Sequence, residues 1–273
     1  MNILFVICAR AGSKGVKGKN TRLFLGKPLI YYTVAAFEEY RLKHNAEDNV
    51  DLAINTDSEL LVKQLRGTGI EYISVDRKDY LAGDLVAKKD VIQDTLKEVE
   101  QINGIIYDVI VDLDLTSPLR TAGDIDGTIR TLLGDENADI AYSVAEARRS
   151  PYFNMVLQDE KGYYTTVMKS DFVARQQAPK CYDMNASIYA YRRTYLLSSR
   201  IHERKALIWI MQDTGILDID SEDEWVKPEH SIFFYIRVCT IDTYIFMSAK
   251  YSLIFSLCRF NHKKFYILII QIF

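Results

Sequence analysis

The chain has 273 residues, of which 48% are hydrophobic and 26% are charged, and this is enough for one domain with its own core. Its net charge is -3, and acidic and basic residues are mixed along the sequence without the basic stripe of a nucleic-acid-binding protein. No apolar run reaches the roughly 20 residues that a membrane span needs. We therefore expect neither a nucleic acid nor a membrane as a partner.

The four cysteines form no Cys-x-x-Cys pair and no spacing typical of a zinc site. They favour free thiols and a cytoplasmic location, where disulfides are rare. Cys8 stands in an apolar run and is expected to be buried. This run follows no basic segment of the kind that begins a signal peptide, so a buried first strand explains it better.

Short apolar runs typical of buried strands alternate along the chain with amphipathic stretches typical of helices. In chain order, we expect a strand at 3–8, a helix at 28–40, strands at 50–55 and 71–75 separated by a helix at 58–66, a helix at 86–101, a strand at 107–113, a helix at 124–133, and strands at 140–144, 188–191 and 206–211. This repetition predicts an α/β fold, with a mostly parallel sheet and helices on both faces. Ligands bind such sheets at the carboxyl ends of the strands.

The alternation weakens at about 150–185, where two runs, 152–157 and 163–168, flank Gly162 and predict a hairpin. We interpret this region as an inserted flap. A second irregularity is the tail. Residues 231–273 contain no Gly, Pro or Glu and are dominated by Ile, Phe, Tyr, Ser and Lys. A shifted reading frame or a genuine hydrophobic appendage would each explain such a segment.

The loop after the first strand, residues 9–20, combines glycines with basic side chains. Glycines let a backbone approach a ligand closely, and the positive charges of Arg10, Lys14, Lys17 and Lys19 suit a polyphosphate. The loop is not a Walker A motif, because Ser13 stands where that motif needs its first Gly and Asn20 stands where it needs Ser or Thr. A bland surface loop is the alternative.

Three further segments carry polar groups. Residues 112–120 place two carboxylates, two hydroxyls and an arginine at the end of the most apolar strand, and a capped strand exit is the alternative. Residues 182–189 include Asn185 and Ser187, which suit a polyhydroxylated ligand but equally suit a polar loop entering a strand. Asp218 and Asp220 are two apart, so in an extended segment both carboxylates face one spot, as a Mg²⁺ site requires.

Together these motifs resemble one family. Ala-Arg-x-Gly-Ser-Lys-Gly followed by Lys-Asn, then Thr-Ser-Pro-Leu-Arg, then Arg-Gln-x-x-Pro, then Asp-Ile-Asp, in this order and spacing, are similar to the acylneuraminate cytidylyltransferases, over roughly residues 1–226. The resemblance implies a nucleotide-diphospho-sugar transferase-like (Rossmann-like) fold, a homodimer whose flap takes part in dimerisation, and transfer of CMP from CTP to an acidic nine-carbon sugar. Residues 227–273 lie beyond it.

The resemblance also implies roles for individual residues. The nucleotide would be bound by Arg10, Gly12, Ser13, Lys14, Lys19, Asn20 and Arg77. The sugar would lie near Asp114, Thr116, Ser117, Arg175, Gln176 and Asn185. Asp218 and Asp220 would hold Mg²⁺, and catalysis would rest on Arg10, Lys14, Lys19 and Asp218. No histidine lies within the motifs, so the sequence names no general base.

Two departures from the family pattern concern the sugar. Many sialic acid enzymes read Gln-Pro-Thr-Ser-Pro, whereas here Asp114 and Leu115 precede Thr116, and Asn185-Ala186-Ser187 replaces Asn-Gly-Ala. These forms resemble most the branch that activates N,N'-diacetyllegionaminic acid. A Kdo or N-acetylneuraminate cytidylyltransferase is the alternative. A non-catalytic nucleotide-binding module is a more distant one, against which the aspartate pair argues.

Overall fold

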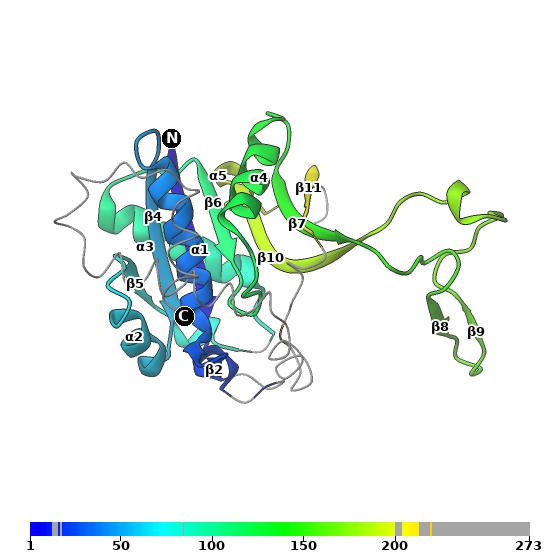
Figure 1. The fold of residues 1–273 in the computed structure, drawn as a ribbon, viewed down its shortest axis with the longest axis horizontal. Helices are drawn as coiled ribbons and strands as arrows, with labels where there is room; N and C mark the ends of the chain where they lie inside the picture. Colours follow the sequence, from blue (N-terminus) through cyan, green and yellow to red (C-terminus); the bar gives the residue numbers. More distant parts are fainter. Residues whose placement is uncertain (13–15, 17, 84, 200–203, 213–218, 220–273) are drawn as a thin grey trace, which may run out of the picture.

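A seven-stranded sheet forms the centre of the molecule (Figure 1). The computed structural model describes residues 1–12, 16, 18–83, 85–199, 204–212 and 219. The sheet consists of β1 (Asn2–Ala9), β4 (Asn49–Thr56), β5 (Ile73–Asp76), β6 (Val109–Leu113), β7 (Ile140–Glu146), β10 (Tyr182–Arg192) and β11 (Ala206–Ile210), in the order β11-β7-β10-β6-β1-β4-β5. Only β10 among these runs antiparallel to its neighbours, so the predicted mostly parallel sheet is confirmed.

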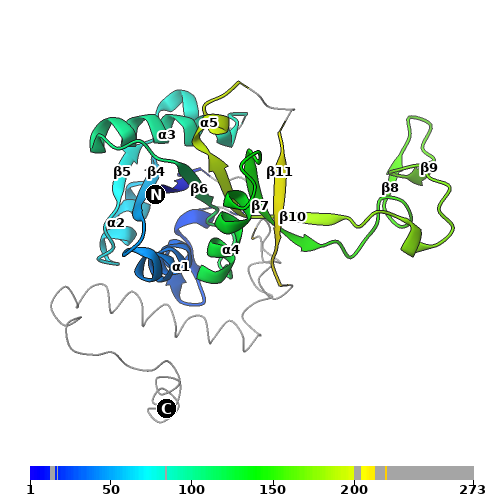
Figure 2. The ribbon, with the colours of Figure 1, turned by 90° about the horizontal axis from the view of Figure 1, so that it is seen from above.

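Helices cover both faces of this sheet, as predicted (Figure 2). The helices α1 (Leu29–His44), α2 (Glu59–Arg66) and α4 (Ala122–Leu133) share one apolar cluster with one face of the strands. The helix α3 (Lys88–Asn103) and the short α5 (Arg193–Leu196) share a second cluster with the opposite face. Because both faces are buried, β1 reads as a nearly continuous apolar run rather than an alternating one.

Local signals set where the helices begin and end. The Ser58 hydroxyl accepts a hydrogen bond from the Leu61 amide and caps α2. Thr121 and Asp124 form a capping box that starts α4 two residues before the predicted position. The helix predicted from residue 28 begins one residue later, and Pro28 is its N-cap residue. Pro28 also ends a small hairpin, β2 (Leu23–Phe24) and β3 (Lys27–Pro28), which was not predicted from the sequence.

The strand β10 is much longer than the predicted 188–191. Its register against β7 shifts between Met184 and Tyr189, and Ala186 within that irregularity has a positive φ of 48°. Such a bulge breaks the alternation of exposed and buried residues on which a strand prediction depends. The polar run 185–187 is therefore part of the sheet and is carried next to the carboxyl end of β6.

Residues 147–181, which we call the arm, leave the sheet between β7 and β10 and extend well away from the body (Figures 1 and 2). The predicted hairpin around Gly162 is present as β8 (Val156–Gln158) and β9 (Tyr164–Thr166). Both strands are shorter than expected, because residues 151–154 form turns and residues 167–168 form a bend. The inserted segment of the prediction is thus a protruding arm.

Three other expectations concern particular segments. Cys8 and Cys181 are free thiols, and Cys8 is partly rather than fully buried; burial raises the pKa of its thiol to about 12. No helix among the described residues has the length and apolar character needed to cross a bilayer. The tail predicted at 227–273 lies outside the described residues.

Candidate nucleotidyltransfer site

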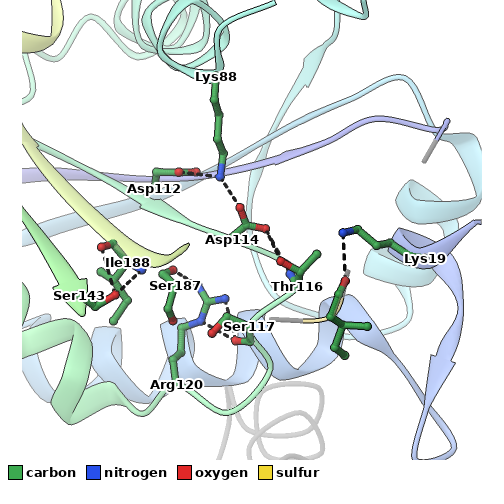
Figure 3. Close-up of polar contacts among 11 residues, drawn as sticks. Lys19, Lys88, Asp112, Asp114, Thr116, Ser117, Arg120, Ser143, Ser187 and Ile188 are labelled. Carbon is green, nitrogen blue, oxygen red and sulfur yellow. Dashed lines mark hydrogen bonds and ion pairs between the residues drawn. The ribbon is translucent and has the colours of Figure 1, made fainter. Parts of the chain in front are cut away.

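Three segments that are distant in the sequence meet at the carboxyl ends of β1 and β6 (Figure 3). They are the end of the first loop at Lys19, the β6 exit at 114–120, and Ile219, which is the one residue that the structure describes in the segment 213–273. The Lys19 ammonium donates a hydrogen bond to the Ile219 carbonyl, with an N–O distance of 3.0 Å. The Ile219 amide in turn donates to the Thr116 carbonyl at 2.9 Å. Three of the four sequence motifs therefore converge here.

Ile219 is fixed by packing as well as by hydrogen bonds. It is fully buried, in a small apolar cluster with Val16, Phe24, Leu29 and Tyr32. It is also the central residue of the Asp-Ile-Asp motif. Its neighbours Asp218 and Asp220, like Ser13 and Lys14 of the first loop, lie outside the described residues. The structure thus places Ile219, the central residue of the Asp-Ile-Asp motif, between Lys19 of the basic loop and Thr116 of the β6 exit.

The β6 exit is a tight, polar turn built around Asp114. Its Oδ1 accepts hydrogen bonds from the Thr116 amide at 3.2 Å and the Thr116 hydroxyl at 3.1 Å. Its Oδ2 lies 2.7 Å from the Lys88 ammonium. The Asp114 amide donates to the Ser187 carbonyl on β10, which ties the turn to the β10 bulge.

Lys88 was not identified from the sequence, yet its ammonium lies against two carboxylates of this region. Its ammonium also lies 2.7 Å from Asp112 Oδ2, and the Asp112 side chain is fully buried in β6. Burial acts to lower the pKa of Lys88, but the two carboxylates outweigh it and raise the pKa well above its usual value. An aspartate in the middle of an apolar strand is the signal that could have predicted a nearby cation.

The two aspartates respond differently to the same lysine. Burial raises the pKa of Asp112, and the pull of Lys88 only partly offsets it. Burial also acts to raise the pKa of Asp114, but Lys88 and the Thr116 amide lower it to about 2. Asp114 is therefore ionised at neutral pH. It presents an acceptor-only carboxylate, 26% exposed, at the edge of the site.

Arg120 holds the other side of the turn. Its side chain is fully buried, and its guanidinium donates to the Ser117 carbonyl through Nε and Nη2 and to the Ser187 carbonyl through Nη1. The Ser117 and Ser187 hydroxyls are buried beside it and have no hydrogen-bond partner among the described residues. Arg120 thus clamps the β6 exit onto β10, and the predicted Thr116 and Ser117 lie in the clamped turn.

The nucleotide-binding residues predicted in the first loop lie around the β1 exit. The Asn20 side-chain amide donates to the Arg10 carbonyl at 2.9 Å, and the Ala11 amide, next to Gly12, donates to Asp57 Oδ1 at 2.6 Å. These contacts fold the described part of the loop back over the strand ends.

Arg77 follows β5, one strand beyond β4. Its Nε donates to Asn55 Oδ1, and the Asn55 amide donates to the Thr95 hydroxyl on α3. Arg77 also borders a cavity of about 620 Å³, lined by Thr56, Asp57, Ser58, Glu59, Val62, Lys63, Arg66 and Asp76. A cavity of this size at the ends of parallel strands is suited to a small-molecule ligand, and its lining carries both cations and carboxylates.

The remaining predicted sugar residues are not all gathered at this site. Asn185 is buried in β10, where its Oδ1 accepts from the Ser143 hydroxyl at 2.7 Å and its amide contacts the Met211 sulfur, so it stabilises the sheet. Arg175 and Gln176 lie in a short 3-10 helix of the arm and are exposed. Within one chain, the arm carries these two residues away from the β6 exit (Figure 1).

The family model for cytidylyltransferases matches residues 4–210, which include all of the central sheet except the first two residues of β1. The chain belongs to the cytidylyltransferase family. This cytidylyltransferase is 38% identical to the post-translational flagellin modification protein B of Campylobacter coli and 37% identical to the CMP-N,N'-diacetyllegionaminic acid synthase of Campylobacter jejuni. Each comparison covers 81% of this chain and 90% of the relative.

The solved structure of CMP:2-keto-3-deoxy-manno-octonic acid synthetase complexed with CTP is also similar. The match covers 89% of this chain and 100% of the synthetase chain, with a TM-score of 0.56 and 17% sequence identity. It therefore supports the fold alone. The resemblance drawn from the motifs is confirmed at the level of the family and the fold.

Proposed function

We propose that this cytidylyltransferase transfers CMP from CTP to the anomeric hydroxyl of a legionaminic-acid-like nonulosonate. In this reaction the hydroxyl oxygen attacks the α-phosphorus of CTP, the bond to the β-phosphate breaks, pyrophosphate leaves, and the hydroxyl proton is lost. The proposal rests on the hydrogen bonds that join the basic loop, Ile219 and the β6 exit. They occur in a chain that is 37% identical to a CMP-N,N'-diacetyllegionaminic acid synthase. N-acetylneuraminate or Kdo is the alternative acceptor.

The residues of this site suit that reaction by charge and position. Negative charge develops on the phosphate oxygens, so catalysis depends on positioning and on nearby cations. Arg10 and Lys19 lie at the exit of β1 and would face the triphosphate together with Lys14. Thr116 and Ser117 lie in the clamped turn beside them, where they would line the sugar end of the site.

We also propose that Mg²⁺ is needed. No cluster of three or more His, Cys, Asp or Glu side chains in the described part of the chain could hold a metal ion, and Asp112 already pairs with Lys88. Ile219, the residue between Asp218 and Asp220 in the sequence, lies between Lys19 and Thr116, and the hard carboxylate oxygens of an aspartate pair suit Mg²⁺. Bound there, the ion would polarise the α-phosphate.

The sugar preference gives the first test. Pyrophosphate release should be measured with CTP against a panel of nonulosonates, and we expect the highest kcat/KM with N,N'-diacetyllegionaminic acid. That sugar carries an acetamido group at C7 and a methyl at C9, where N-acetylneuraminic acid carries hydroxyls. A site built to bind hydroxyls would reject their absence strongly. A preference for N-acetylneuraminic acid would contradict the sugar assignment and leave the family intact, whereas no release with any panel member would contradict the proposed function.

The arm supports the proposal of a homodimer. It exposes many apolar side chains, among them Val156 at 60%, Tyr163 at 71%, Tyr164 at 66% and Val173 at 88%. Exposed apolar surface of this kind is typical of a contact surface. We propose that a two-fold dimer buries the arm against a partner and brings Arg175 and Gln176 to the partner's site.

Co-expression of two inactive chains tests this arrangement. If Arg175 acts in the partner's site, a chain with Arg175→Ala and a chain with Asp218→Asn form mixed dimers in which one of the two sites is intact. With random pairing, about a quarter of the wild-type activity should return. A co-expressed mixture as inactive as its parents, or a monomeric mass in light scattering, would contradict the proposal.

A further inference from the structure

The lysine at the start of α3 reaches across to the β6 exit, and the sequence motifs of the family do not include it. The Lys88 side chain points from the helix towards Asp112 and Asp114, and its ammonium lies 2.7 Å from a carboxylate oxygen of each (Figure 3). One ammonium is thus shared by two carboxylates. Only one of them, Asp112, is fully buried and needs a partner for its charge.

Asp114 is held at both of its oxygens. Lys88 holds Oδ2, while the Thr116 amide and hydroxyl hold Oδ1. The Thr116 carbonyl then accepts from the Ile219 amide. A continuous set of contacts therefore runs from α3 through Asp114 and Thr116 to the centre of the Asp-Ile-Asp motif. Moving Lys88 would free the carboxylate that orders this turn.

Asp114 occupies the position where many sialic acid enzymes have glutamine. A glutamine amide can donate and accept hydrogen bonds, whereas an ionised carboxylate only accepts. Lys88 keeps that carboxylate ionised and fixes its orientation, so the site edge presents an acceptor to a hydroxyl or amide N–H of the substrate. A carboxylate here without a cation would repel an acidic sugar.

We propose that Lys88 is a positioning residue for the sugar, which holds Asp114 in the orientation that orders Thr116 and accepts a hydrogen bond from the acceptor substrate. This rests on the proposed function, since it assumes that an acidic nonulosonate binds at the β6 exit. Lys88 acts through Asp114, while CTP lies on the side of the basic loop. Its loss should therefore affect the sugar more than the nucleotide.

The test is Lys88→Met, assayed with CTP and the best nonulosonate of the panel. We expect the KM for the sugar to rise about tenfold while the KM for CTP stays within about twofold. Lys88→Arg should recover most of the loss, because a guanidinium can also bridge two carboxylates. Unchanged sugar KM in Lys88→Met, or an equal rise in both KM values, would overturn the proposal.

The neighbouring lysine supplies a matched control. The Lys89 ammonium donates to the Ser198 carbonyl at 3.1 Å and lies 4.6 Å from the centre of the Tyr195 ring, so it ties α3 to α5 outside the site. Lys89→Met removes the same charge from the same helical turn. We expect it to lower the melting temperature and leave the sugar KM unchanged. A rise in sugar KM equal to that of Lys88→Met would overturn the proposal.

A double variant separates positioning from simple charge compensation. Lys88→Met leaves Asp112 buried without its cation, which threatens folding, whereas Lys88→Met with Asp112→Asn removes that unpaired charge. We expect the double variant to fold and to keep the raised sugar KM, because Asp114 is still released. Return of the sugar KM to the wild-type value would show that Lys88 only compensates Asp112. Wild-type protein without turnover would instead refute the proposed function, and this inference would fall with it.

Discussion

Replacing Asp218 and Asp220 together by asparagine is expected to lower kcat/KM by at least about 10³-fold, as the loss of a metal site at a transferring phosphate does. Asparagine keeps the size of each side chain and removes the charge that Mg²⁺ requires. Ile219 between them is fixed by Lys19, Thr116 and apolar packing, so the motif should stay in place in the variant. Pyrophosphate release from CTP measures the effect.

Two comparisons make this result specific. Glu71→Gln with Glu136→Gln removes two exposed carboxylates outside the motifs and should leave turnover unchanged. Wild-type protein in EDTA should lose turnover as the double variant does, and added Mg²⁺ should restore the wild type alone. Full wild-type turnover in EDTA, or a double variant with normal kinetics, would contradict a metal site at the Asp-Ile-Asp motif.

Much of the fold could be predicted from the sequence because local signals agree with it. The buried strands are short apolar runs, and Ser58 caps its helix by a side chain that is visible in the sequence. β10 was only partly predicted, because Ala186 at a bulge interrupts the alternation on which a strand prediction depends. The small hairpin before α1 was missed because each strand has two residues, too few to show a period.

The residues of the candidate site could likewise be predicted from the sequence only in part. The first loop, the β6 exit and the Asp-Ile-Asp motif have distinctive residues at fixed spacing, so their meeting could be expected from the topology of a parallel sheet. Lys88 could not, because its pairing with Asp112 and Asp114 depends on how α3 lies across the sheet. The position of Arg175 could not be predicted either, because the sequence indicates an insertion but not the direction in which it extends from the sheet.

Of the substitutions proposed here, replacement of Arg120 by methionine is expected to lower the free energy of unfolding the most. Its buried guanidinium donates three hydrogen bonds to the carbonyls of Ser117 and Ser187. Arg120→Met fills a similar volume but leaves the Ser117 carbonyl without these donors and removes a positive charge near Asp112 and Asp114. We expect the free energy of unfolding to fall by about 3–5 kcal/mol, as when one partner of a buried charged network is removed. Urea denaturation measures this loss.

The same clamp should matter for turnover, and a second arginine shows whether this is specific. Arg192 also donates to backbone carbonyls, those of Leu132, Asp135 and Ala138, at the opposite end of β10 from the site. Arg192→Met should cost about 1–2 kcal/mol of stability and leave kcat unchanged, because it releases carbonyls away from the β6 exit. Arg120→Lys keeps the charge but not the planar fork, so it should fold with intermediate stability and reduced kcat.

An Arg120→Met protein within about 0.5 kcal/mol of the wild type, which is the effect of an ordinary surface substitution, would contradict the clamp. Equal losses of kcat in Arg120→Lys and Arg192→Met would show that turnover follows general stability rather than the position of the Ser117 turn.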